Sequence, residues 1–96
     1  MSDIMTESEI ATIFNKVFNG AHNFMTPDIT GYMVAGPYLV ECGKGSGFTP
    51  GTMLYGVTVL KRSDTGEFEP DHERSMAFHS RAEASRHIQG LTKEDQ

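Results

Sequence analysis

The stretch that decides the fold runs from Met53 to Arg62 and reads Met-Leu-Tyr-Gly-Val-Thr-Val-Leu-Lys-Arg. Successive side chains of a β-strand point to opposite sides of the sheet. One side of this stretch therefore has Tyr55, Val57 and Val59, and the other has Leu54, Gly56, Thr58 and Leu60. A strand that is apolar on both sides is typical of the centre of a sheet. We expect a central strand that is covered on each face.

Two further strands are expected, one on either side of this stretch in the sequence. Residues 38–42 alternate in the manner of a strand, and residues 76–79 do so over a shorter length. The glycine-rich segment 43–51 is expected to be the loop between the first two strands. Residues 20–31 are expected to form a connecting loop, and the β-rich part of the chain begins at Tyr32.

A helix is expected at each end of the chain. Thr6 and Glu9 have the spacing of a capping box, and the apolar residues that follow recur with the period of a helix over residues 7–19. These apolar residues are Ile10, Ile13, Phe14, Val17 and Phe18, and Gly20 is placed to end the helix. Ser80 and Glu83 form a second capping box, which opens a helix that carries Ala84, Ile88 and Leu91 on one face.

The order of these elements predicts the α+β class. The chain has 96 residues and a mass of 10.6 kDa, which is the size of one domain. Short connections make neighbours in sequence neighbours in space. We therefore expect residues 1–96 to form a single compact domain, with residues 1–5 and 92–96 flexible. Its architecture is expected to be a three-stranded antiparallel meander with both helices packed on one face, in the order α-β-β-β-α.

The composition narrows the functional classes. Thirteen acidic residues against eight Lys and Arg give a net charge of −5, which disfavours direct binding to nucleic acid or to an anionic membrane. The only cysteine, Cys42, excludes an internal disulfide and is consistent with a reducing compartment. The N-terminus lacks the basic and apolar regions of a signal peptide, and no apolar run is long enough for a membrane span. We expect a cytoplasmic protein.

Carboxylates at alternating positions give the leading functional hypothesis. They lie in the segment before the last strand, at Glu67, Glu69, Asp71 and Glu73. Such a series suits contact with a basic protein, for example one that normally holds phosphate groups. The competing interpretation is a solvated loop. We expect a non-catalytic binding or inhibitor module that acts through a protein partner, in the format of a phage or mobile-element accessory protein.

A positive region gives a weaker alternative. Lys44, Ser46, Lys61 and Arg62 are candidates for contact with an anion or with nucleic acid. The glycine-rich loop around Lys44 does not match a phosphate-binding loop, because Tyr38 and Gly45 occupy positions that such a loop gives to Gly and to Ser or Thr. A mobile hairpin loop is the simpler interpretation, and direct nucleic-acid binding ranks low.

Two more alternatives remain open. Cys42 with a histidine would make a small enzyme, although a lone cysteine in an alternating strand more often packs as a small apolar side chain. The histidines at positions 22, 72, 79 and 87 lack the spacing of a zinc motif, so no metal and no cofactor is expected. A homodimer with a small-ligand site on an open face of the sheet is the last alternative.

Overall fold

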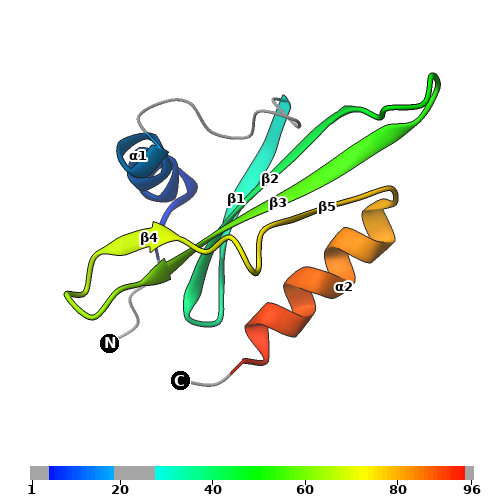
Figure 1. The fold of residues 1–96 in the computed structure, drawn as a ribbon. Helices are drawn as coiled ribbons and strands as arrows, with labels where there is room; N and C mark the ends of the chain where they lie inside the picture. The colour runs from blue at the N-terminus through cyan, green and yellow to red at the C-terminus, as the bar shows by residue number, and fades with distance from the viewer. Residues whose placement is uncertain (1–4, 19–27, 95–96) are drawn as a thin grey trace.

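The computed structural model describes residues 5–18 and 28–94 (Figure 1). Within these residues two helices flank a five-stranded antiparallel sheet. The elements are α1 (Glu7–Phe18), β1 (Asp28–Ala35), β2 (Tyr38–Ser46), β3 (Met53–Arg62), β4 (Phe68–Pro70), β5 (Met76–Phe78) and α2 (Arg81–Thr92). The predicted α+β class and the placement of a sheet between an N-terminal and a C-terminal helix are confirmed.

β3 is the central strand, as its sequence predicts. It pairs with β2 along its whole length, from Ser46 opposite Met53 to Leu39 opposite Leu60. On its other side it pairs first with β5 and then with β4. Val59 lies between these two short strands. Its carbonyl accepts a hydrogen bond from the N–H of Asp71 at 2.9 Å, and its own N–H donates to the hydroxyl of Ser75 at 2.9 Å.

The sheet has more strands than the expected three. β1 occupies residues 28–31, which were expected to be loop; the register shifts between Ile29 and Gly31, and this bulge breaks the alternation by which a strand is recognised. β4 has only three residues and lies within an acidic run, so it gives no usable pattern. β2 extends to Ser46, because residues 43–46, which were expected to belong to the loop, pair with β3. The loop between β2 and β3 is therefore confined to residues 47–52.

The two helices pack on opposite faces of the sheet, which corrects the expectation that they share one face. Ile10 and Phe14 of α1 are buried against Leu39 and Leu60. The second core contains Ala84 and Leu91 of α2 with Ala35, Tyr38, Val40, Val57 and Val59 of the sheet. Figure 1 shows the sheet passing between the helices. The physical reason lies in β2 and β3, because both of their faces are apolar and each face needs a cover.

The predicted capping box at Thr6 is complete, and of the one predicted at Ser80 the N-cap hydrogen bond is present. The Thr6 N–H donates to Oε1 of Glu9 at 2.8 Å, and the Glu9 N–H donates to the Thr6 hydroxyl at 3.1 Å. At α2, the Glu83 N–H donates to the hydroxyl of Ser80 at 3.1 Å. The predicted Gly20 cap, the loop at 20–27 and the ends 1–4 and 95–96 lie outside the described residues.

Side chains from distant parts of the chain hold the end of α2. Arg74 forms an ion pair with Asp71 at 2.9 Å and another with Glu94 at 3.0 Å, and its guanidinium lies 4.9 Å from the centre of the Tyr38 ring. Gly36 lies in the turn before Tyr38 and packs against the backbone of the last turn of α2. Glu94, which belongs to the segment 92–96 that was expected to be flexible, makes these contacts with Arg74 and a hydrogen bond with Tyr38.

α1 also contacts the edge of the sheet. β1 is the first strand in the sheet order, and the backbone N–H of Tyr32 donates to Oε2 of Glu7 at 3.3 Å. The Tyr32 hydroxyl bonds instead to Glu41, whose side chain is fully buried. Burial, the hydrogen bond to Glu41 and the negative charge of Glu41 raise the pKa of Tyr32 to about 12.

Candidate functional site

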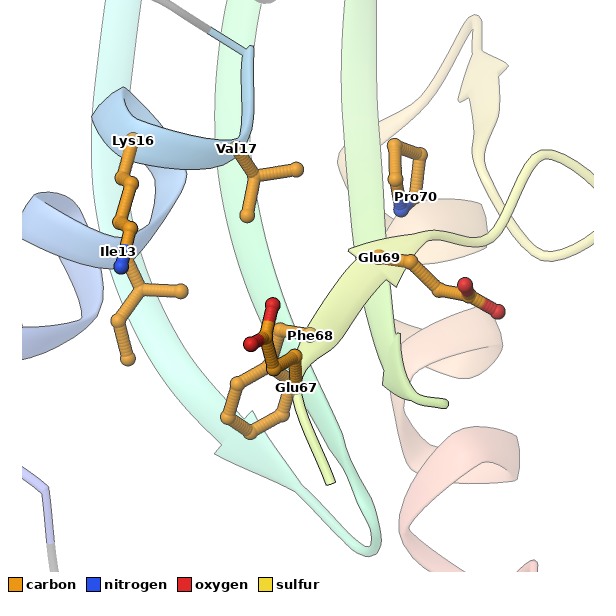
Figure 2. A pocket seen from close by; sticks show the side chains of 7 residues that line it. All are labelled: Ile13, Lys16, Val17, Glu67, Phe68, Glu69 and Pro70. Carbon is orange, nitrogen blue, oxygen red and sulfur yellow. The ribbon is translucent and has the colours of Figure 1, made fainter. Parts of the chain in front are cut away.

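The candidate site is a groove between the second half of α1 and strand β4 (Figure 2). Its volume is about 520 Å³. The residues that line it are Ile13, Lys16, Val17, Glu67, Phe68, Glu69 and Pro70. Figure 2 shows the three residues of α1 on one side of the groove and the residues around β4 on the other. Two segments about fifty residues apart in the sequence therefore build one surface feature.

The apolar wall on the α1 side follows from the position of its residues on the helix. Ile10 and Phe14 form the centre of the apolar stripe and are fully buried. Ile13 and Val17 lie at the margin of the same stripe, where they are only half-buried. Because they are one turn apart, they present a continuous apolar surface to the groove.

The opposite wall is built around Phe68. Its ring packs against the α1 side of the core, and the guanidinium of Arg62 lies 4.3 Å from the ring centre. The same guanidinium donates a 2.6 Å hydrogen bond to the carbonyl of Gly66. Arg62 thus connects the β3–β4 turn to the aromatic side chain, which holds Phe68 in place.

Three charged side chains surround the apolar surface. Figure 2 shows the Glu67 carboxylate beside the Phe68 ring, while the Glu69 carboxylate points away from α1. Glu69 lies 4.0 Å from the ammonium of Lys61, and both side chains are nearly half exposed, so this pair is weak. Lys16 lies on the α1 side. The groove therefore has an apolar interior, with the carboxylates of Glu67 and Glu69 on the β4 side and the ammonium of Lys16 on the α1 side.

The four predicted partner-binding carboxylates divide into three groups. Glu67 and Glu69 line the groove. Glu73 is exposed, but it lies outside the groove. Asp71 is only 1% exposed and is paired with Arg74, so it is not part of an exposed acidic surface. Arg74, the partner of Asp71, also pairs with Glu94, and local sequence does not show that long-range contact.

The four predicted anion-contact residues do not gather into one site. Lys44 lies opposite Tyr55 in the register, whereas Lys61 lies six residues further along β3, about 20 Å away at 3.3 Å per residue. Ser46 ends β2, and Arg62 is engaged with Phe68 and Gly66. The separation of these residues weakens the nucleic-acid alternative.

A second cavity of about 300 Å³ lies between α2 and the sheet, and Cys42 is in its wall. Burial and the neighbouring charge of Glu41 raise the pKa of the Cys42 thiol. No histidine in the part of the chain that the structure describes lines this cavity. His87 hydrogen-bonds the carbonyl of Arg74 at 2.7 Å and packs on Phe78. Among residues 5–18 and 28–94, the geometry thus offers no histidine partner for Cys42 in this cavity.

Among residues 5–18 and 28–94, no three His, Cys, Asp or Glu side chains are grouped so that they would hold a metal ion. Neither α1 nor α2, the helices of the described chain, has the length and apolar character needed to cross a membrane.

The apolar half of the groove was not identified from the sequence. Ile13 and Val17 were recognised as part of a helical stripe, and the register of that stripe marks them as its margin. Phe68 stands between two carboxylates in an otherwise polar run, which is the one local signal of a contact surface on β4.

We compared the chain with known proteins in three ways. It matches no protein-family model, no curated protein and no solved structure.

Proposed function

We propose that the protein is a non-catalytic binding module that takes up a segment of a partner protein in the α1–β4 groove. The observation that carries this proposal is the apolar groove itself, where Ile13, Val17 and Phe68 remain only half-buried in the folded chain. Apolar surface that stays in contact with water gains free energy when a partner covers it. Charged groups at the rim of the groove fix the orientation in which a partner binds.

The charges around the groove favour a basic partner. Glu67 forms no ion pair within the described residues, and Glu69 has only a weak one. A partner segment with a basic side chain beside an apolar one would place its charge near Glu67 and its apolar group against Phe68. Lys16 on the opposite rim disfavours a second basic group there. The net charge of −5 steers the whole molecule toward a basic surface.

In this proposal the partner surface is one that otherwise holds phosphate groups, so the module competes with nucleic acid for it. The apolar groove supplies affinity, and the carboxylates supply orientation and the rate of association. This is the mode of action of a small inhibitor or accessory protein, and it requires no catalytic residue.

The test is affinity capture from an extract of the source cell with two groove variants. Val17→Asp places a charge in the apolar wall, and Glu67→Lys reverses the acidic rim. Thr12→Asp, on the exposed side of the same helix, and Glu73→Lys, outside the groove, are the matched controls. Circular dichroism checks that all four variants are folded.

We expect the retained proteins to be lost with both groove variants and kept with both controls. The same retained proteins with all four variants would exclude the groove as the binding site. Loss with Glu73→Lys as well as Glu67→Lys would instead assign the contact to the acidic segment as a whole.

A further inference from the structure

The cavity under α2 has the layout of a small-molecule site that is separate from the α1–β4 groove. Its floor comes from the sheet and its roof from α2. The apolar residues that line it are Met33, Cys42, Tyr55, Val57, Ala84 and Ile88. Its volume of about 300 Å³ is at the lower end of the range for ligand pockets. A ligand of this cavity is therefore small.

Small residues on α2 create the space. Ala84, Ser85 and Ile88 line the cavity, and larger side chains at the first two positions would fill it. Met33, Cys42 and Tyr55 remain partly exposed around the cavity. Apolar surface is therefore still available for a ligand to bury.

Three polar side chains line the cavity, Thr30 of β1 and Arg81 and Ser85 of α2. Arg81 and Ser85 are four residues apart and lie on the same face of α2, at its N-terminal end. The Arg81 guanidinium lies 5.6 Å from the centre of the Tyr55 ring. Among the described residues, Arg81 forms no ion pair with a carboxylate. Within residues 5–18 and 28–94, no carboxylate therefore neutralises the positive charge at this end of the cavity.

We propose that this cavity binds a small anionic amphiphile, a medium-length alkyl chain that ends in a carboxylate. The alkyl chain lies between α2 and β1–β3, along Ala84 and Ile88. The carboxylate is placed at the N-terminal end of α2, where Arg81 pairs with it and the hydroxyl of Ser85 lies on the same helical face. An uncharged molecule of the same shape would leave Arg81 unpaired, and a cationic one would be repelled.

Cys42 gives a direct readout of occupancy. It is the only cysteine of the chain, it lines the cavity, and it is half-buried. A molecule that fills the cavity covers the thiol and slows its alkylation. The experiment measures the rate at which N-ethylmaleimide modifies Cys42, with mass spectrometry as the detector, against increasing sodium octanoate below its micelle concentration. The backbone amide shifts of Val57 and Ala84 in a ¹⁵N-labelled sample provide a second measurement.

We expect octanoate to slow the alkylation severalfold with saturation, and to shift both amides over the same concentration range. Octyltrimethylammonium, which has the same chain with the opposite charge, is expected to give no protection. Arg81→Gln should raise the apparent dissociation constant of octanoate about fivefold, the effect of one partly exposed ion pair. Arg86→Gln, on the same helix but outside the cavity, should leave it unchanged. Ser85→Trp, at an exposed position of the wall, should abolish protection by filling the space.

Three results would overturn the proposal. The first is an unchanged alkylation rate together with unchanged amide shifts. The second is equal protection by octyltrimethylammonium. The third is an equal effect of Arg81→Gln and Arg86→Gln. None of these results bears on the α1–β4 groove, because the two sites share no lining residue.

Discussion

The hydroxyl of Tyr38 donates a 2.6 Å hydrogen bond to Oε1 of Glu94, which lies 56 residues further along the chain. Arg74 contacts both partners, since its guanidinium pairs with Glu94 and lies over the Tyr38 ring. The start of β2, the segment between β4 and β5, and the end of α2 are thereby joined at one point. This junction closes the α2 side of the domain.

Asp71 is expected to contribute to stability rather than to partner binding. It is 1% exposed, and its carboxylate accepts hydrogen bonds from the backbone and the side chain of Arg74 at 3.2 and 2.9 Å. Asp71→Asn weakens charged hydrogen bonds in a buried place, which should lower the free energy of unfolding by about 1–3 kcal/mol. Glu73→Gln, two residues away and exposed, is the control and should change it little. Urea denaturation measures both; equal, small effects would contradict the structural role of Asp71.

The Glu94 junction predicts a loss of stability in acid. The hydrogen bond from Arg74 and, to a smaller extent, the one from Tyr38 hold the pKa of Glu94 below its ordinary value of 4.5. The folded state therefore releases this proton more readily than the unfolded state. Its stabilising effect is complete above pH 4.5 and is lost as the pH falls through the lower pKa of the folded protein.

The measurement compares the thermal midpoints of the wild type and Glu94→Gln between pH 7 and pH 2. The wild type should be the more stable protein at pH 7, and the difference should shrink toward pH 2. A difference that is constant with pH would show that the Glu94 carboxylate does not carry the effect.

Tyr32 should ionise only at strongly alkaline pH. Its pKa of about 12 means that the folded state resists ionisation that the unfolded state undergoes near pH 10. The corresponding stability is present below pH 10 and declines as the pH rises toward 12. Absorbance at 295 nm follows tyrosinate formation, and Tyr32→Phe should remove the step at about pH 12. Retention of that step in the variant would assign it to another tyrosine.

Gly36 should tolerate alanine far less than Gly51 does. Both have positive φ, +60° and +85°, so alanine introduces backbone strain of about 1–2 kcal/mol at either position. At Gly36 the added Cβ would also lie 2.7 Å from the carbonyl oxygen of Leu91, whereas at Gly51 it would meet nothing within 4 Å. Urea denaturation should show a clearly larger loss of stability for Gly36→Ala. Equal losses would mean that the turn and α2 move apart easily.

The elements that depend on local sequence could be predicted. Both helices begin one residue after the N-cap residues Thr6 and Ser80, as the spacing of these residues indicates. β3 was recognised because it is apolar on both faces. β1 was not, because its bulge interrupts the alternation. The face on which each helix packs depends on the side chains of β2 and β3 that it contacts. The local sequence of the helix does not indicate which of the two faces that is.

The candidate site was predicted only in part, for the same reason. Glu67 and Glu69 stand out as carboxylates in the sequence. The apolar half of the groove joins α1 to β4, and only the folded chain brings Val17 near Phe68. Asp71 has the same spacing as its acidic neighbours, but it is buried and paired with Arg74, which also pairs with Glu94.

The hydrogen bond between Glu7 and the backbone of Tyr32 has a consequence for how the protein avoids aggregation. β1 is an edge strand, and its outward N–H groups are a template on which another polypeptide can add as a strand. The carboxylate of Glu7, in the first turn of α1, accepts a hydrogen bond from the N–H of Tyr32. This N–H, in the middle of the edge, is therefore not available to another strand. Partial unfolding that releases only α1 would uncover the template while the sheet persists. Fibril formation should then follow the opening of this helix rather than the unfolding of the whole domain.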